Sequence, residues 1–252
     1  MERFMKMLEN EFRNSLKEIA GQYHLGDNLD DKIYDQMFHL ELAKKISNLL
    51  SPGVRVLELG YGEGTVSREI FTKYATERHI IEGAEELAEA ARGHLGKQAQ
   101  IHNCLFSEFQ DKDKFDLVLA TNVFEHVENT NELFLSIKQW LKKDGICVIT
   151  VPNSESFHRR IAVEMGLQNS TKTLSDRDKK VGHLRVYDLA EISHEIRANN
   201  FKIIKTEGMV LKFLSNSLQL QLPVGIASAL QNLAAQYPPE YSANLYLEVV
   251  VN

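Results

Sequence analysis

Hydrophobic residues near the start of the chain recur at helical spacing. An apolar side chain occupies every fourth position there, which is typical of an amphipathic helix. The members of this stripe are Phe4, Leu8, Phe12 and Leu16. A second helical pattern covers residues 36–50 and ends at the breaker Ser-Pro-Gly of residues 51–53. The polar face of the first helix mixes acidic and basic residues, which favours packing on the protein's own body over binding to a membrane surface.

From residue 54 on, short apolar runs alternate with amphipathic segments. The runs predict five strands, at residues 54–59, 78–82, 99–103, 115–120 and 145–151. Between most of them the spacing predicts helices, at residues 65–75, 84–95 and 131–143. The third helix is expected to end with Lys142 and Lys143 in its last turn and Gly145 just beyond. Strands that alternate with helices pair in parallel through right-handed crossovers, so the pattern predicts an α/β, Rossmann-like, doubly wound sheet.

After the fifth strand the alternation is interrupted. Residues 152–182 are polar and irregular, and they are too long for a simple connection, which predicts a cap over a site. A helix at 186–200 and a strand at 201–209 follow, and a helical segment at 224–237 leads to a last strand at 244–251. We therefore expect a mostly parallel seven-stranded sheet with helices on both faces.

The predicted elements form one structural domain. We expect residues 1–50 to form an N-terminal helical lid and residues 51–252 to form the core, with a cap insertion at about 153–185. The length of 252 residues fits one α/β domain with such additions.

Composition and charge disfavour several functional classes. A net charge of −6 argues against broad nucleic-acid binding, because such binding neutralises many phosphates. The chain has no apolar run of about 18 residues and no secretory leader, so we expect a cytoplasmic protein without a membrane partner. Cys104 and Cys147 are far apart and form no CxxC motif, so we expect neither a disulfide framework nor a metal site. The expected state is a monomer or a homodimer.

Three glycines at alternate positions follow the first predicted strand, in the sequence VLELGYGEGT of residues 56–65. In a doubly wound sheet, ligands bind beyond the carboxyl ends of the strands, so this loop is placed to hold one. The triphosphate-binding pattern GxxxxGK[ST] is absent, and the dinucleotide pattern GxGxxG would need a glycine where Thr65 stands. The acid Glu58 lies two residues before the first glycine. A carboxylate beside a tight backbone turn suits a ligand that carries an amino-acid tail.

Several segments of the chain resemble the class I S-adenosylmethionine (SAM)-dependent methyltransferases. ELGYGEG resembles motif I of that family, FDLVLATNVFEHVENTNELF resembles its strand-four segment, and LKKDGICVITVPN resembles its strand five. GHLRVYDLAEISHEIRANNFKIIKTEG is similar to a passage in the branch that contains the ubiquinone-biosynthesis O-methyltransferases, with Asn200 where that branch usually has glycine. The first three segments lie in order within residues 54–153.

The resemblance implies SAM as the cofactor, S-adenosylhomocysteine as the product, and a set of cofactor contacts. Glu58 and the glycines would hold the methionine portion, and Glu82, at the end of strand two, would accept hydrogen bonds from the ribose diol. Asn103 would contact the adenine, with Leu105 or Phe106 as the apolar wall. The full expected cofactor set is Glu58, Gly60, Tyr61, Gly62, Gly64, Glu82, Gly83, Asn103, Leu105, Phe106 and Thr121.

Methyl transfer to a hydroxyl or a neutral amine also needs a base, and histidine titrates nearest to neutral pH. His126, just after strand four, is the first candidate for a base or for orienting the acceptor, and His183 in GHLR is the second. The alternative is that the Glu-His pair of this branch only fixes a loop.

The expected substrate contacts are Tyr23, His24, Asn153 and Arg185. The cap carries a mild basic bias, and Arg185 is the best candidate for gripping a carboxylate or phosphate in two places. In the second half of the cap the other basic residues are Lys172, Arg177, Lys179 and Lys180, against only Asp176 and Asp178 as acids. The plainer interpretation of these charges is a solvated loop.

These observations predict transfer of a methyl group from SAM to an O or N atom of a small, anionic metabolite. A nucleotide-linked sugar or a surface-polysaccharide precursor is an alternative acceptor. Bases of nucleic acids are disfavoured, because the [ND]PP[YFW] tetrapeptide of base amino-methylating enzymes is replaced by TNVF. From other classes, a NAD(P)-dependent oxidoreductase and a non-catalytic SAM-binding partner domain remain as alternatives.

Overall fold

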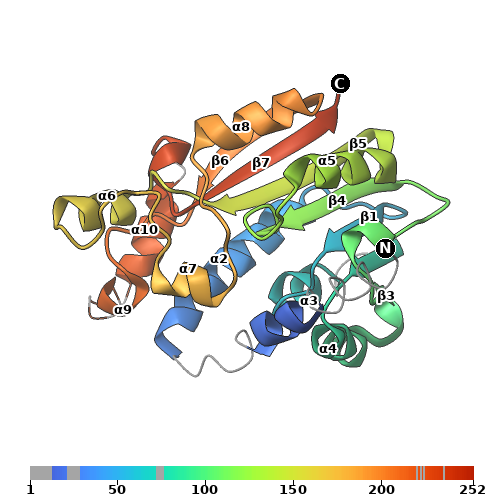
Figure 1. The fold of residues 1–252 in the computed structure, drawn as a ribbon, viewed down its shortest axis with the longest axis horizontal. Coiled ribbons are helices and arrows are strands. Elements are labelled where there is room, and N and C mark those ends of the chain that lie inside the picture. Colours follow the sequence, from blue (N-terminus) through green and yellow to red (C-terminus); the bar gives the residue numbers. More distant parts are fainter. Residues whose placement is uncertain are drawn as a thin grey trace, which may run out of the picture.

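One seven-stranded sheet lies at the centre of the computed structural model, which describes residues 13–21, 29–71, 77–219, 221, 223, 225–234 and 236–252 (Figure 1). The strand order is β3-β2-β1-β4-β5-β7-β6. The strands are β1 (Arg55–Leu59), β2 (Glu77–Ile81), β3 (Gln100–His102), β4 (Phe115–Thr121), β5 (Leu141–Pro152), β6 (Phe201–Met209) and β7 (Asn244–Val251). The predicted Rossmann-like seven-stranded sheet is confirmed.

The sheet is mixed, because β7 runs antiparallel to both of its neighbours, β5 and β6. Strands β1 to β5 pair in parallel. The last strand follows β6 along the chain and enters the gap between β5 and β6, where it completes the hydrogen bonds of both. The parallel pattern predicted from the alternation of strands and helices therefore holds for the first five strands and not for the last pair.

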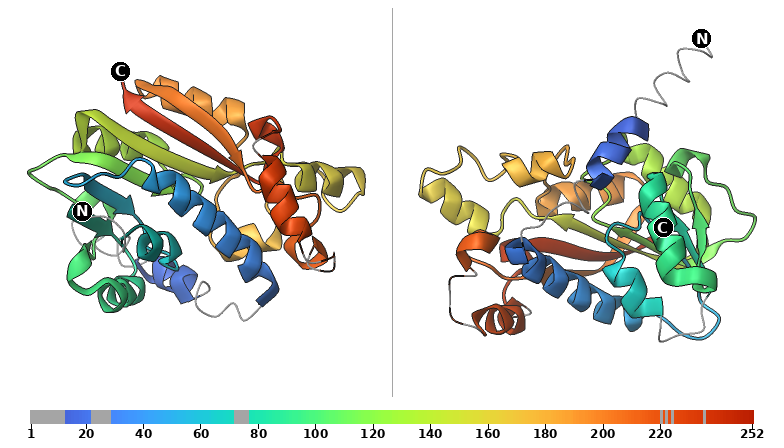
Figure 2. Two further views of the ribbon diagram at one scale, coloured as in Figure 1. Left: turned by 180° about the vertical axis from the view of Figure 1, so that it is seen from behind. Right: turned by 90° about the horizontal axis from the view of Figure 1, so that it is seen from below.

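Helices cover both faces of the sheet (Figure 2). One face is packed by α2 (Leu29–Ser47), α3 (Thr65–Phe71) and α4 (Glu85–Leu95), and the other by α5 (Thr130–Trp140) and α8 (Leu189–Ala198). Side chains of β4 alternate between the two cores, as the pleat requires: Leu117 and Leu119 face α2 and α3, whereas Val118 and Ala120 face α5. The alternation explains why an inner strand reads as a continuous apolar run.

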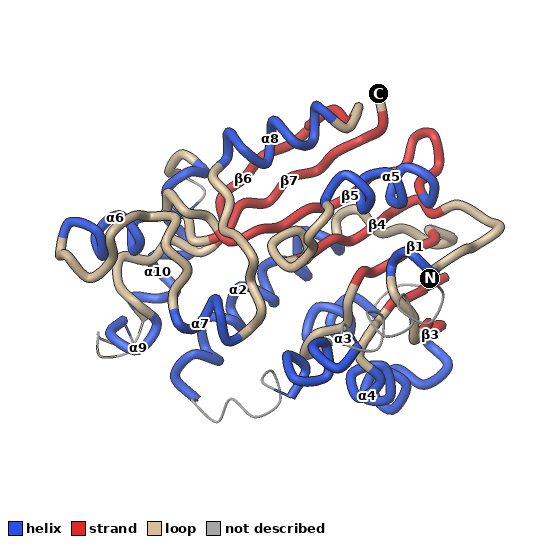
Figure 3. Tube along the Cα trace, in the orientation of Figure 1, coloured by secondary structure: helices blue, strands red, loops and turns tan. Residues whose placement is uncertain are grey.

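Shorter helices gather beyond the end of β5, and long loops join them (Figures 1 and 3). They are α6 (Phe157–Glu164), α7 (Asp176–Lys180), α9 (Asn216–Gln219) and α10 (Ile226–Ala234). Three short 3-10 turns complete the described elements: η1 (Gly96–Gln98), η2 (Phe106–Glu108) and η3 (Pro239–Tyr241). No helix among the described residues is long and apolar enough to cross a membrane.

The predicted lid falls only partly within the described residues. Residues 13–21 form a helix, and α2 continues from Leu29, so that Phe38, Leu42 and Ile46 pack into the core between α2 and the sheet. The rest of the first predicted helix lies outside the described residues. The division into lid, core and cap therefore stays a prediction.

The helix before β5 ends three residues earlier than predicted. It ends at Trp140, and Leu141 already pairs with Phe115 of β4, so Lys142, Lys143 and Gly145 belong to the strand. Leu141 is buried in the core, and the Lys142 ammonium lies 2.8 Å from an oxygen of Asp116. These contacts stabilise the extended conformation of a Lys-Lys-Asp-Gly segment that is polar enough to be mistaken for a helix end.

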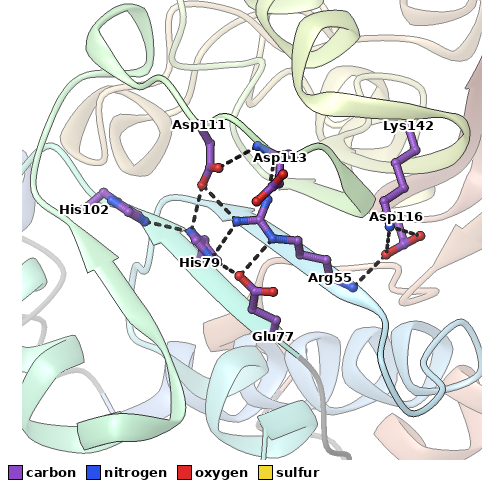
Figure 4. Close-up of polar contacts among 8 residues, drawn as sticks. All are labelled: Arg55, Glu77, His79, His102, Asp111, Asp113, Asp116 and Lys142. Carbon is purple, nitrogen blue, oxygen red and sulfur yellow. Dashed lines mark hydrogen bonds and ion pairs between the residues drawn. The ribbon is translucent and has the colours of Figure 1, made fainter.

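A partly buried charge network joins the amino ends of β1 and β2 to the loop before β4 (Figure 4). The Arg55 guanidinium donates to Glu77 Oε1 at 2.9 Å, to the Asp113 carbonyl at 2.6 Å and to Asp111 Oδ2 at 3.0 Å. Its side chain is only 10% exposed. His79 lies 3.2 Å from the same guanidinium. Because a buried guanidinium left without acceptors is costly, this network fixes the alignment of the two strands.

The network makes stability depend on Asp111. Burial opposes the charge of Asp111, but the Asp113 backbone N–H and the Arg55 guanidinium outweigh it and hold the pKa of the carboxyl below its ordinary value. We expect Asp111→Asn to lower the free energy of unfolding at pH 7 by about 2 kcal/mol. A lowered folded-state pKa stabilises the protein above the unfolded value, near pH 4, and this stabilisation is lost as the pH falls through the folded value. The difference between the two proteins in urea unfolding should therefore shrink below about pH 4.

Asp113→Asn is the matched control, because Asp113 joins the network through its backbone atoms. It should change the free energy of unfolding by less than about 0.5 kcal/mol. Equal losses in the two variants would contradict the assignment.

Candidate active site

The glycine loop turns sharply between β1 and α3. Gly60, Gly62 and Gly64 have φ angles of 77°, 54° and 69°, in the left-handed region that favours glycine. The Gly60 N–H donates to the Ile81 carbonyl at 2.8 Å, which ties the loop to β2. A Cβ built on Gly60 or Gly62 would have no atom within 4 Å. Open space therefore lies over the first two glycines, at the carboxyl end of the sheet.

Two buried glutamates, Glu58 and Glu82, form hydrogen bonds that hold this loop and the helix after it in place. Glu58, in β1, accepts a hydrogen bond from the Ser67 hydroxyl of α3 at 2.6 Å, and burial raises its pKa to about 8. Glu82, after β2, accepts the Tyr61 N–H and the Ala84 N–H, each at 2.8 Å. Burial raises the pKa of Glu82 although these backbone donors oppose the shift. The structure thus brings both predicted acids to the loop.

The expected adenine contacts lie at the ends of β2 and β3. The Asn103 amide donates to the Glu82 carbonyl at 2.9 Å, which leaves its oxygen as an acceptor. A Cβ built on Gly83 would lie 3.4 Å from the Leu105 side chain and 2.9 Å from Leu16, which comes from the helix of residues 13–21. Phe106 opens η2 and packs on the core. These residues lie around the ends of β2 and β3, and their contact with adenine stays a prediction.

The end of β4 lies beside the glycine loop. The register pairs Glu58 with Leu119, which places Thr121 next to Gly60 in the neighbouring strand. After Thr121 the chain turns through Asn122, which has a φ of 53° and accepts a hydrogen bond from the Thr150 hydroxyl at 2.9 Å. This turn directs the following loop, with Glu125 and His126, toward the cap.

His126 and His183 meet where that loop contacts the cap. Their ring centroids lie 4.8 Å apart in an edge-to-face arrangement. His126 Nδ1 lies 3.2 Å from the Gly182 carbonyl, and His183 Nδ1 lies 3.0 Å from Asp178 Oδ1. Burial and the neighbouring His183 lower the pKa of His126 to about 4, so this imidazole is neutral at pH 7. The structure therefore pairs the two histidines that sequence analysis selected separately.

Sequence analysis missed Glu125 and Asp178, which complete this cluster. Glu125 is fully buried, and burial raises its pKa to about 8. Asp178 binds Arg159 at 2.6 Å and the Ser175 hydroxyl at 2.7 Å. A Glu-His pair just after a strand was the available signal for Glu125. Asp178 lies in the charged sequence SDRDKK, which gives no signal of burial.

Two residues expected to contact the substrate, Asn153 and Arg185, instead donate side-chain hydrogen bonds to backbone carbonyls. The Asn153 amide donates to the carbonyls of Glu240 and Ser242, each at 2.7 Å. The Arg185 guanidinium donates to the Val127 carbonyl at 2.6 Å and to the Glu128 carbonyl at 3.3 Å.

The remaining substrate candidates do not form a free cationic surface. Tyr23 and His24 lie outside the described residues. Among the basic residues of the cap, Lys172 contacts Asp188 and Glu191, and Arg177 contacts Asp35. These pairs favour the interpretation of the cap charges as a solvated, ion-paired surface.

Known proteins match this chain in sequence and in fold. A family model described as a methyltransferase domain matches residues 34–206. Phosphoethanolamine N-methyltransferase 2 of Caenorhabditis elegans is 25% identical over 61% of this chain and 37% of its own length. A ubiquinone biosynthesis O-methyltransferase of Rhodopseudomonas palustris is 30% identical over 44% of each chain. The matches thus span less than half the length of these two curated relatives.

A solved structure shares the architecture at low sequence identity. It is a chain of the complex between the Haloferax volcanii Trm112 methyltransferase activator and a methyltransferase, with a TM-score of 0.61 and 15% identity, covering 93% of this chain and 98% of that one. At this level of identity the likeness supports the fold.

The contacts of the glycine loop predict unequal tolerance of alanine. A Cβ on Gly64 would lie 2.1 Å from Cζ of Tyr61, whose ring is buried and whose hydroxyl lies 2.8 Å from His94 Nδ1. Gly62→Ala should lower the free energy of unfolding by about 1–2 kcal/mol, because alanine is strained in the left-handed region and no other clash is added. We expect Gly64→Ala to add about 1–3 kcal/mol of overpacking to that cost. Urea unfolding of both variants measures the difference, and equal losses would show that Tyr61 moves aside freely.

Proposed function

The chain belongs to the methyltransferase domain family, and we propose that it transfers the methyl group of SAM to an oxygen or nitrogen atom of a small metabolite. The observation that carries the proposal is the juxtaposition of two clusters at the carboxyl edge of the sheet. One is the glycine loop with Glu58 and Glu82, and the other is the pair of His126 and His183. A methyl donor on the first cluster would present its sulfonium toward the second.

The contacts of the loop support the proposed cofactor assignments. The methionine portion would lie over Gly60 and Gly62, where added side chains would meet open space. Glu82 lies just after β2 with its oxygens facing the backbone N–H groups of the loop, and we propose that a ribose diol shares these oxygens as acceptors. The free oxygen of Asn103 can accept the adenine amino group. We assign the remaining contacts to Glu58, Tyr61, Gly64, Gly83, Leu105, Phe106 and Thr121.

We assign the proton-transfer role to His126, supported by His183. The imidazole is neutral at pH 7 and can accept a proton, but the pKa of about 4 makes it a weak base at that pH. The sulfonium is already activated, so the second role of the cluster is to hold the acceptor in line with the methyl group. Relatives named as N-methyltransferases and as O-methyltransferases support either acceptor atom. We propose the cap, residues 153–185, as the cover of the acceptor, and the helix of residues 13–21 as the cover of the adenine end.

The cofactor assignment can be tested by binding. We expect SAM and S-adenosylhomocysteine, and not NADH, to give saturable heat in calorimetry and to raise the melting temperature. Glu82→Ala should weaken S-adenosylhomocysteine binding about 10- to 100-fold, because hydrogen bonds to a charged acceptor are lost. Glu89→Ala, on the exposed side of α4, is the matched control. A response to NADH alone would overturn the proposal.

An analogue of S-adenosylhomocysteine without the two ribose hydroxyls separates the two roles of Glu82. If Glu82 binds the diol, Glu82→Ala should change the affinity for this analogue much less than the affinity for S-adenosylhomocysteine. An equal loss for both ligands would mean that Glu82 acts only by holding the loop.

The role of His126 can be tested once an acceptor is known. A panel of phosphorylated metabolites, organic acids and nucleotide-linked sugars, scored by S-adenosylhomocysteine release, supplies the acceptor. We expect His126→Ala to lower kcat by about 10²- to 10⁴-fold while S-adenosylhomocysteine binding stays close to normal. His194→Ala, at an exposed position of α8, should leave kcat unchanged. Full activity of the His126 variant would exclude it from catalysis.

A further inference from the structure

Three side chains of types that can bind a metal meet where the loop after β4 contacts the cap. Glu125 and His126 come from the loop, and His183 comes from the segment after α7. One donor atom of each residue lies within 4.8 Å of the others. The cap is fastened at this place, because the Leu184 N–H donates to the Glu125 carbonyl at 2.8 Å. The three side chains are therefore held together by the backbone.

The Glu125 carboxyl has no satisfying partner. Its side chain is fully buried, and neither oxygen has a hydrogen-bond partner on any other described residue. A buried carboxylate without a donor or a counter-charge costs several kcal/mol. The nearby cations are engaged elsewhere: Arg159 binds Asp178, and Arg185 binds backbone carbonyls. The position calls for either a proton or a cation.

The histidines are arranged as metal ligands commonly are. The Gly182 carbonyl and the Asp178 carboxylate each lie against Nδ1 of one ring. Acceptors at these positions keep the proton on Nδ1 and leave the lone pair of Nε2 free for a cation. Asp178 is fixed in turn by Arg159 and by the Ser175 hydroxyl. Outer contacts of this kind orient metal-binding imidazoles.

We propose that Glu125, His126 and His183 bind one divalent transition-metal cation. The cation would satisfy the buried carboxylate and join the loop after β4 to the cap. Two imidazoles with one carboxylate suit zinc, cobalt, iron or manganese, whereas magnesium and calcium prefer a shell of oxygen atoms. Three protein ligands also leave a coordination position open.

The open coordination position could bind the methyl acceptor, an inference that rests on the proposed function. An acceptor hydroxyl or carboxylate bound there would be held beside the methyl donor, and a bound hydroxyl would lose its proton more easily, to solvent water. With the cation bound, His126 Nε2 is a ligand, so the cation would take over from His126 the task of promoting proton loss. The class of acceptor is then an oxygen-bearing anion or alcohol that can coordinate a cation. Such a ligand needs no free arginine, in agreement with the engaged state of Arg185.

The test uses the full chain, stripped with a chelator and titrated with Co²⁺ and Zn²⁺. We expect one equivalent of Co²⁺ to give visible absorption bands and saturable heat, with Zn²⁺ displacing it and Mg²⁺ having little effect. Glu125→Gln and His183→Gln should each weaken Co²⁺ binding by at least about 10-fold, as should Asp178→Asn through its contact with His183. His194→Gln, on the exposed side of α8, is the matched control and should bind as the unaltered protein does.

Two results would overturn the site. One is the absence of bands and saturable heat in the unaltered protein. The other is equal Co²⁺ affinity in the control and in those site variants that circular dichroism shows to be folded. A Glu125→Gln variant that is more stable and insensitive to metal would show that Glu125 carries a proton instead. S-adenosylhomocysteine binding, measured on the same samples, distinguishes failure of the metal site from failure of the proposed function. Its loss would count against the proposed function and not against the metal site.

Discussion

The candidate site depends on a single buried carboxylate that joins two turns of backbone. Glu82 accepts N–H groups from Tyr61 in the glycine loop and from Ala84 at the start of α4. These turns leave the neighbouring strands β1 and β2, so the interaction fixes the carboxyl ends of both strands relative to each other. Desolvation raises the pKa of this carboxyl, and the backbone donors act against the rise. Any further donor that a ligand brings would stabilise the charge, so the group that supports the loop is also suited to the diol proposed above.

A second carboxylate organises the opposite part of the site. Asp178 binds Arg159 of α6, Ser175 before α7 and His183 after it, and Arg159 also holds the carbonyls of Thr171 and Thr173. The irregular cap therefore has a polar centre in place of a large apolar one. An Asp–Arg pair buried among hydrogen bonds specifies one arrangement of the loops, because removing either partner leaves a buried charge unpaired. The position of His183 follows from this centre.

The local part of the structure was predictable from sequence, and the long-range polar part was not. Apolar runs and glycines identified the strands, the loop and Glu82, because each signal lies within a few neighbouring residues. Asn200 stands where the related branch usually has glycine, and it adopts the left-handed region with a φ of 62°. The antiparallel direction of β7 depends on its pairing with the free edges of β5 and β6. These strands are distant along the chain, so no local sequence pattern indicates the direction. The backbone contacts of Asn153 and Arg185 likewise depend on segments distant along the chain.

Three buried glutamates at the carboxyl ends of β1, β2 and β4 show why the chemistry of a residue cannot be inferred from its type and strand position alone. Glu58 is satisfied by a hydroxyl, Glu82 by backbone N–H groups, and Glu125 by no other described residue. Burial raises the pKa of all three, but the available donors differ. A hydroxyl can stabilise either the neutral or the charged carboxyl, whereas backbone N–H groups favour the charged form. A buried carboxyl without any donor favours binding of a proton or a metal cation. The same residue type, at the same edge of one sheet, thus accepts a hydrogen bond from a hydroxyl, accepts the backbone N–H groups of a loop, or lacks a donor and needs a proton or a cation.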